Sequence, residues 1–97
     1  MRLFANKDTE RVFHGQHAVR LPANLQGRAR MRLQRVMAAT KLSDLRLPPS
    51  HHLEALKGDR RGQHSIRIND QWRVCFRWTD QGARTQGART IEITDYH

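Results

Sequence analysis

The clearest alternation of hydrophobic and polar residues lies in the second half of the chain. Residues 65–68 alternate, residues 72–78 alternate strictly, and the turn-forming pair Asn69-Asp70 separates them. Because successive side chains of a strand point to opposite faces, this pattern predicts an antiparallel hairpin. Residues 90–95 alternate in the same way and predict a last strand.

The first half of the chain has helical spacing instead. Asn6 and Asp8 can cap a short helix that runs to Phe13, and Gly15 ends it. Leu21-Pro22 predicts the start of a longer helix, because proline fits the first helical turn. Its hydrophobic residues recur every three or four positions, which predicts one buried stripe. The stripe consists of Leu25, Ala29, Leu33, Val36 and Met37. On another face beside it lie Arg28, Arg32 and Arg35.

Shorter segments complete the pattern. Residues 2–5 are compatible with an edge strand, and residues 53–56 with a short strand or turn. Residues 43–50 form an irregular connector, residues 57–62 a basic loop, and residues 79–89 a loop that repeats Gly-Ala-Arg. The expected fold class is α+β, with N-terminal helices packed on a small, twisted, mainly antiparallel sheet. The length fits one domain, residues 1–97.

Composition adds a strong charge signal. The net charge is +9, and 15 of the 18 basic residues are arginine, the exceptions being Lys7, Lys41 and Lys57. The arginine guanidinium matches two phosphate oxygens at once, so a nucleic-acid partner is expected. An acidic protein partner, or a charge that serves solubility, stays open as an alternative. With no apolar run near 20 residues and no signal peptide, a cytoplasmic location is the default expectation and no membrane is involved.

The strand pattern predicts which side chains share a face. Trp72, Val74, Phe76 and Trp78 are expected to pack on the helices, and Arg73 and Arg77 to lie on the opposite face with a half-buried Cys75. Arg67 joins them from the neighbouring strand. These positions carry cations without balancing acids, so they predict a phosphate-binding platform.

The chain closes on Asp95, Tyr96 and His97, three groups able to transfer protons or bind phosphate. Cleavage of RNA by internal transfer needs a base for the 2′-hydroxyl, cations for the charged phosphorane and an acid for the leaving oxygen, but no metal. The chain has candidates for each part. The pair His51-His52 lacks the spaced partners of a zinc site, so no metal and no cofactor is expected.

Several motifs in this order resemble the HigB branch of the RelE/ParE toxin superfamily. They are Leu56-Lys57-Gly58-Asp59, Ser65-Ile66-Arg67-Ile68, the segment from Trp72 to Trp78, and the closing Asp95-Tyr96-His97. The resemblance spans nearly the whole chain and implies a microbial-ribonuclease-like fold. It also implies a toxin that cleaves messenger RNA in the ribosomal A site and is neutralised by a HigA-like helix-turn-helix antitoxin. DNA would be contacted only through the antitoxin complex.

The resemblance assigns roles to individual residues. It implies that Lys57 and Arg73 bind phosphate or stabilise the transition state, and that Asp95, Tyr96 and His97 form the terminal catalytic group, with His97 the leading acid or base. Strand geometry and the basic loop add four candidate RNA-binding residues: Arg60, Arg61, Arg67 and Arg77.

This chain departs from the family at Glu54, where the family commonly has histidine. Either Glu54 takes over as base, or His52 substitutes through a two-residue strand shift, or turnover is weak. A second departure is the extended 79–89 loop, expected beside the active end of the sheet. Two other functions stay open: a non-catalytic ParE-like inhibitor of DNA gyrase, and a plain RNA-binding module.

Overall fold

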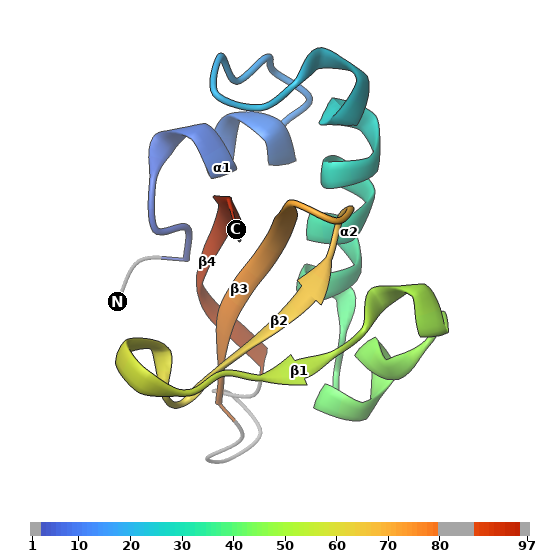
Figure 1. Cartoon of the computed structure of the whole chain (residues 1–97), viewed down its shortest axis with the longest axis vertical. Coiled ribbons are helices and arrows are strands. Elements are labelled where there is room, and N and C mark those ends of the chain that lie inside the picture. The colour runs from blue at the N-terminus through green and yellow to red at the C-terminus, as the bar shows by residue number, and fades with distance from the viewer. Residues whose placement is uncertain (1–2, 80–86, 96–97) are drawn as a thin grey trace.

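The computed structural model describes residues 3–79 and 87–95, and it has the predicted α+β architecture (Figure 1). Two helices, α1 (Lys7–Phe13) and α2 (Gln26–Ala38), precede four strands. The strands are β1 (Glu54–Ala55), β2 (Gln63–Arg67), β3 (Trp72–Thr79) and β4 (Gly87–Asp95). They form one sheet in the order β1-β2-β3-β4, and each neighbouring pair is antiparallel. Four short 3-10 turns lie between these elements: η1 (Ala23–Leu25), η2 (Leu42–Arg46), η3 (Pro49–His51) and η4 (Gly58–Arg60).

Both helices begin and end where local chemistry allows. The Asn6 side chain accepts a hydrogen bond of 2.8 Å from the Thr9 amide and caps α1, and Gly15 follows the helix with a φ of +80°. The long helix begins later than Leu21-Pro22 predicts, because Pro22 leads into the 3-10 turn η1 and α2 starts only at Gln26. The side-chain Nε2 of Gln26 donates to the carbonyls of Ala18 and Leu21 in the preceding loop and fixes the start of α2.

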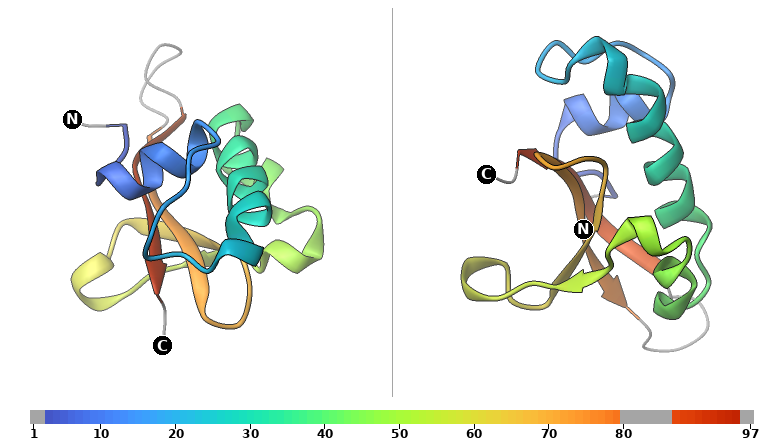
Figure 2. Two further views of the ribbon diagram at one scale, coloured as in Figure 1. Left: turned by 90° about the horizontal axis from the view of Figure 1, so that it is seen from above. Right: turned by 45° about the vertical axis from the view of Figure 1, so that its right-hand side comes forward.

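The helices cover one face of the sheet and close the core (Figure 2). The buried residues are Leu25 from η1, Ala29, Leu33 and Val36 from α2, and Trp72, Val74 and Phe76 from β3. Trp78 packs partly buried against the same cluster. Met37 was expected in the buried stripe but is 37% exposed, because its position points to the flank of α2.

The predicted N-terminal edge strand is reduced to one bridge. Phe4 pairs in parallel with Ile91 of β4, and the Ala5 amide donates to the Ile91 carbonyl at 2.8 Å. The Phe4 ring packs against Phe13 with their centres 5.3 Å apart. The ring contact ties Phe4 to α1, and the bridge to Ile91 ties it to β4.

The hairpin of β3 and β4 is longer than the sequence pattern predicts. Gly87 pairs with Thr79, so 87–89 belong to β4 and not to the expected 79–89 loop. The two strands change register between Cys75 and Arg77, and Thr90 has a φ of +54°. Glycines at 82 and 87 interrupt the alternating pattern, so the sequence did not predict that β4 begins at Gly87. The rest of that loop, residues 80–86, lies outside the described residues.

Candidate active site

The face of the sheet that points away from the helices carries the predicted arginines. Arg67 of β2 lies directly opposite Arg73 of β3, and Ser65 lies opposite Cys75. Paired residues of antiparallel strands point to the same side. The prediction that Arg67 joins Arg73 on one face is therefore confirmed.

Arg73 is held by partners from three directions. Its Nε donates to Ser65 Oγ at 2.7 Å, its Nη2 donates to the His52 carbonyl at 2.7 Å, and Nη2 lies 3.8 Å from Glu54 Oε1. Only 14% of the Arg73 side chain is exposed. Such multiple anchoring fixes the planar guanidinium in one orientation, as the stabilisation of a developing charge requires.

The position of His52 explains one of these contacts. His52 follows η3 with φ 47° and ψ 55°, the left-handed conformation that favours glycine. This conformation places its carbonyl within reach of Arg73. The hypothesis of a two-residue strand shift is wrong, because Glu54 pairs with Ser65 and His52 lies outside β1. The exposed His52 side chain nevertheless lines the same hollow as Glu54.

The expectation of cations without balancing acids is also wrong. Arg73 lies beside Glu54, and Arg67 forms an ion pair with Asp70 of the β2–β3 turn. Asp70 follows Asn69 in that turn, and the turn brings its carboxylate back toward Arg67. The strand pattern predicts that the arginines share one face. It does not predict that Asp70 of the turn and Glu54 of the edge strand β1 lie beside them.

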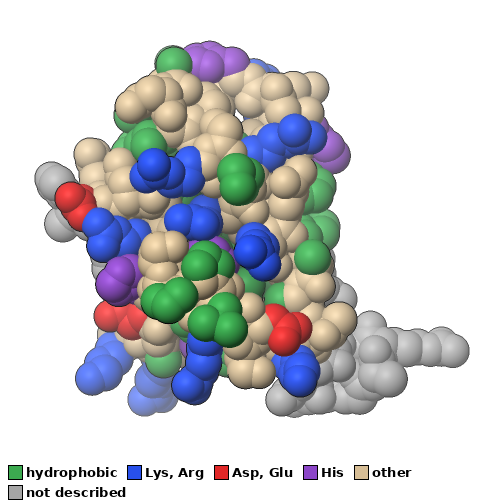
Figure 3. Space-filling view, turned by 90° about the vertical axis from the view of Figure 1, so that its right-hand side faces the viewer, with side chains coloured by type: hydrophobic (Ala, Val, Ile, Leu, Met, Phe, Trp, Pro, Cys, Tyr) green, Lys and Arg blue, Asp and Glu red, His purple; other side chains and the backbone are tan. Residues whose placement is uncertain are grey.

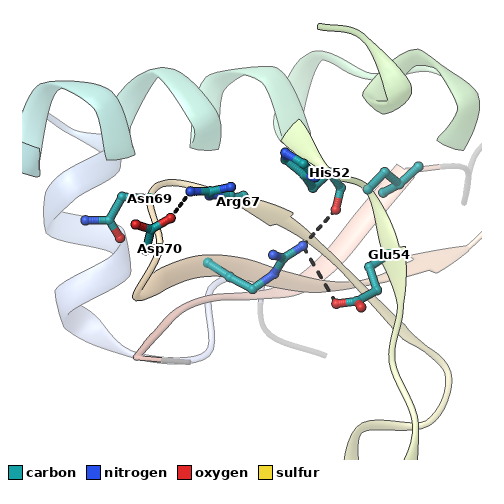
Figure 4. Close-up of a pocket in the computed structure, with 7 residues that line it drawn as sticks. His52, Glu54, Arg67, Asn69 and Asp70 are labelled. Carbon is teal, nitrogen blue, oxygen red and sulfur yellow. Dashed lines mark hydrogen bonds and ion pairs between the residues drawn. The ribbon is translucent and has the colours of Figure 1, made fainter. Parts of the chain in front are cut away.

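These groups line one hollow of about 430 Å³ between β1, β2 and the β2–β3 turn (Figure 4). Its lining residues are His52, Leu53, Glu54, Arg67, Asn69, Asp70 and Arg73. The labelled side chains converge on the hollow from three segments of the chain (Figure 4). Two cations and two carboxylates face a space open to solvent, an arrangement that suits a charged, hydrated ligand such as a phosphodiester.

The basic loop after β1 lies on the side of the sheet away from α2 (Figure 2, right). Lys57 and Arg61 are exposed, as expected of phosphate ligands. Arg60, predicted to bind RNA, instead donates to Glu92 Oε1 of β4 at 3.2 Å and to Gln63 Oε1 at 3.1 Å. Arg60 therefore ties the loop to the sheet.

Arg77 lies farther along β3, where it is exposed and pairs with Gln63 of β2. A side chain at Gly62 would meet the Arg77 guanidinium at 3.0 Å, and Gly62 itself has a φ of +93°. Glycine at this position lets the loop backbone pass close to Arg77. Arg77 does not line the hollow around Arg73, so these two arginines define separate parts of the face.

Cys75 was predicted half-buried and is fully buried. Burial raises the pKa of its thiol, so the thiol stays protonated at neutral pH and is a poor nucleophile.

At the C-terminal end, the register places Thr94 opposite Arg73 and Asp95 opposite Trp72. The exposed Asp95 accepts a hydrogen bond of 3.1 Å from Gln71, so the structure does not bring its carboxylate to the hollow. Tyr96 and His97 lie outside the described residues.

Two histidines, His64 and His51, have lowered pKa values, and the sequence analysis did not single out His64. His64 stacks on Phe76 with ring centres 6.2 Å apart, and burial lowers the pKa of His64. Burial also lowers the pKa of His51, whose Nδ1 lies 3.2 Å from the Leu45 carbonyl oxygen. The position of His64, one place before the alternating strand, was the available signal. Within residues 3–79 and 87–95, no three His, Cys, Asp or Glu side chains are grouped to hold a metal.

The arginines of α2 support the hollow from behind. Arg32 Nε donates to the Arg67 carbonyl at 3.0 Å, and Arg28 Nη1 donates to the Ile68 carbonyl at 3.4 Å. Burial, together with the charges of Arg28 and Arg35, lowers the pKa of Arg32. These bonds fix the end of β2 against α2.

Comparison with known proteins places the chain in a family. Residues 2–87 match the family described as HigB-like toxin, the RelE-like toxin of the type II toxin–antitoxin system HigB. Toxin HigB-1 of Vibrio cholerae serotype O1 is 36% identical over 78 residues, which cover 79% of this chain and 82% of that protein. Endoribonuclease HigB of Proteus vulgaris is 29% identical over 97 residues, which cover 100% of this chain and 99% of that protein.

A protein of Haemophilus influenzae with no assigned function is 32% identical over 65 residues, covering 67% of this chain and 64% of that protein.

In the part of the chain that the structure describes, no helix has the length and hydrophobicity needed to cross a membrane. The family match extends over most of the chain and includes the segments that form the hollow. The chain therefore belongs to the HigB-like family of RelE-like toxins of type II toxin–antitoxin systems, and its partner is an antitoxin.

Proposed function

We propose that this toxin is an endoribonuclease that cleaves translated messenger RNA on the 70S ribosome. The observation that carries the proposal is the anchored Arg73 guanidinium beside the Glu54 carboxylate in a hollow open to solvent. One group is suited to hold a phosphate, and the other lies close enough to remove a proton beside it. The similarity to a protein named Endoribonuclease HigB supports the same activity.

The reaction is an internal transfer at one phosphodiester. Glu54 takes the proton of the ribose 2′-hydroxyl, and the 2′-oxygen forms a bond to phosphorus. Arg73 and Lys57 stabilise the negative charge that develops on the phosphate oxygens. The bond from phosphorus to the 5′-oxygen breaks, and that oxygen receives a proton from His97. The products are a 2′,3′-cyclic phosphate and a free 5′-hydroxyl, so no water or metal enters this step.

The remaining candidates bind and orient the RNA. Arg67, Arg61 and Arg77 contact phosphates on either side of the cleaved bond, while Asp95 and Tyr96 support His97. Arg60 acts indirectly through the loop that it tethers. An open site with few tuned acid and base groups gains from a substrate held in the reactive geometry, which is the role we propose for the ribosome.

The antitoxin in this proposal is a HigA-like helix-turn-helix protein, and DNA is contacted only through the toxin–antitoxin complex. The charge of +9 and the surface arginines support an acidic partner surface. The proposed site of action is the cytoplasm, where translated messenger RNA is found.

The test is inducible expression in bacteria followed by mapping of messenger RNA 5′ ends. Growth arrest with new cuts inside translated frames is expected for the wild type. The combined substitution Lys57→Ala, Arg73→Ala and His97→Ala is expected to abolish both effects. Undiminished toxicity of that variant would contradict the proposal, and arrest without cuts would indicate an inhibitor of another target.

Purified components test the ribosome requirement. Messenger RNA incubated with the toxin is expected to stay intact until ribosomes and the matching transfer RNA are added. Equal cleavage of free RNA would show that the ribosome is dispensable. Salt-sensitive RNA binding without cleavage in either mixture would instead favour a plain binding module. The Glu54–Arg73 pair would then serve only to balance charge.

A further inference from the structure

The outer side of α2 combines exposed hydrophobic side chains with unbalanced positive charge. Met31 is 62% exposed, and Leu47, in the connector after η2, is 66% exposed. Single exposed apolar side chains are common on protein surfaces, but contiguous apolar surface rimmed by polar residues marks an interaction site. The 13 residues of α2 contain four arginines and no acid.

These residues lie on one surface. In both views of Figure 2 the η2–η3 connector, which carries Leu47, lies beside the C-terminal part of α2. The charges of Arg32 and Arg35 also lower the pKa of His51 of η3. We call the surface formed by Met31, Arg35 and Leu47, bordered by Arg28 and Arg32, the α2 patch. Figure 3 looks onto this side of the molecule and shows hydrophobic and basic side chains interspersed, with few acidic side chains among them.

The surrounding sequence does not neutralise the α2 patch. From residue 14 to residue 53 the chain carries seven basic residues and one acid, Asp44. The basic residues are Arg20, Arg28, Arg30, Arg32, Arg35, Lys41 and Arg46. Asp44 accepts hydrogen bonds from the amides of Thr40 and Lys41, and these bonds lower its pKa. These bonds keep Asp44 ionised, and its one negative charge offsets only one of the seven positive charges.

We propose that the α2 patch is the docking surface for an acidic, amphipathic segment of the antitoxin. Such a segment would place apolar side chains on Met31 and Leu47 and carboxylates on Arg35 and its neighbours. A second copy of this chain fits poorly, because each copy carries a net charge of +9. RNA fits less well, because none of the five residues of the patch is an aromatic on which a base could stack.

The position of the patch links docking to neutralisation. Arg28 and Arg32 donate to the carbonyls of Ile68 and Arg67, and the next residues, Asn69 and Asp70, line the hollow. A segment bound on the α2 patch therefore lies beside the rim of the hollow and adds bulk that opposes entry into the ribosome. This consequence rests on the proposed function, whereas the docking itself does not.

The direct test measures antitoxin binding apart from toxicity. The toxin carrying Arg73→Ala is produced with the antitoxin of its own module, and affinity is measured by calorimetry after the two are separated and recombined. Adding Met31→Glu and Leu47→Glu is expected to weaken binding at least 100-fold. The matched control is Val19→Glu, which introduces the same charge at a residue that is 87% exposed outside the patch, and affinity is expected to change less than threefold.

An affinity of the double variant within threefold of the parent, with an unchanged melting temperature, would overturn the proposal. If the double variant does not fold, Arg35→Glu alone serves as the second variant, and it is expected to weaken binding at least tenfold. Unchanged binding by a folded Arg35→Glu protein would overturn the proposal as well.

A growth assay separates this proposal from the proposed function. In the active toxin, Met31→Glu with Leu47→Glu is expected to leave toxicity intact and to prevent rescue by the antitoxin. Lost toxicity with retained antitoxin binding would show that the patch contacts RNA or the ribosome and would overturn the docking proposal. Failure of the wild-type toxin to cut messenger RNA would overturn the proposed function and leave the binding result standing.

Discussion

Glu54 of β1 lies 3.8 Å from Arg73 of β3, and Ser65 of the strand between them accepts a hydrogen bond from the same arginine. The carboxylate is 56% exposed, whereas the arginine is nearly covered. A rigid cation thus lies beside an accessible base. This relationship supports the chemical roles proposed for both residues and can be tested one residue at a time.

Substitution of Glu54 tests the proposed base. Glu54→Gln keeps the shape of the side chain but removes its basicity, so ribosome-dependent cleavage is expected to fall about 100-fold or more. Glu54→His, which restores the residue common in the family, is expected to retain most of the activity. Glu10→Gln, at an exposed acid of α1, is the control for the change in net charge. Full activity of Glu54→Gln would assign the carboxylate to charge balance alone.

Glycine at position 52 separates the backbone of His52 from its imidazole. His52→Gly keeps the left-handed conformation and the carbonyl that accepts from Arg73, so cleavage is expected to change by less than about threefold. His52→Ala is expected to destabilise the fold relative to glycine by about 1 kcal/mol, because its Cβ is strained at this φ. Cleavage rates and thermal unfolding check both expectations. Loss of activity in a folded His52→Gly protein would make the imidazole the base.

Arg60 and Arg61 are neighbours with different expected roles. Arg60→Ala breaks the contacts with Glu92 and Gln63 and is expected to lower the melting temperature by a few degrees, since such a pair contributes about 1 kcal/mol. Arg61→Ala is expected to leave the melting temperature unchanged and to reduce the salt dependence of RNA binding by about one phosphate contact. The reverse pattern would restore Arg60 as an RNA ligand.

Asp70 competes with RNA for Arg67. Asp70→Asn removes the ion-pair partner without changing side-chain size, so RNA affinity at low salt is expected to rise about two- to fivefold. Asp59→Asn, at an exposed acid of η4, controls for the change in net charge. A rise of equal size in both variants would show a general charge effect instead of release of Arg67.

Buried His51 and half-buried His64 predict how stability depends on pH. Burial lowers the pKa of His51 and His64 in the folded protein. At pH values between each lowered pKa and about 6.5, the unfolded chain therefore binds more protons than the folded protein. Stability is therefore expected to fall as the pH drops from 7.5 to 5, by about 1.4 kcal/mol for each unit of pKa shift. Thermal unfolding across this range measures it.

For His51, the charges of Arg32 and Arg35 act in the same direction as burial. His64→Gln is expected to flatten part of the pH dependence, because it removes one of the two histidines whose pKa burial lowers. Equal slopes for the wild type and His64→Gln would show that His64 does not contribute.

The sequence by itself determined the parts of the fold that depend on local periodicity. The alternation at 65–68 and 72–78 set the hairpin and the shared face of Arg67 and Arg73, since side-chain direction follows from the two-residue repeat of a strand. The helical stripe set the core face of α2, and the motifs around Lys57 and Trp72 indicated the family. Charge composition indicated a phosphate-rich or acidic partner.

Tertiary structure decided which groups meet. Asp70 meets Arg67 only three positions away, within the predicted hairpin turn, whereas the αL conformation at His52 and the placement of Glu54 beside Arg73 depend on long-range pairing that no local pattern encodes. The same holds for Arg60, which meets Glu92 across 32 positions of the chain. Glu54 reaches Arg73 only when β1 and β2 pair with β3, and that pairing turned the predicted platform of cations into a site with a candidate base.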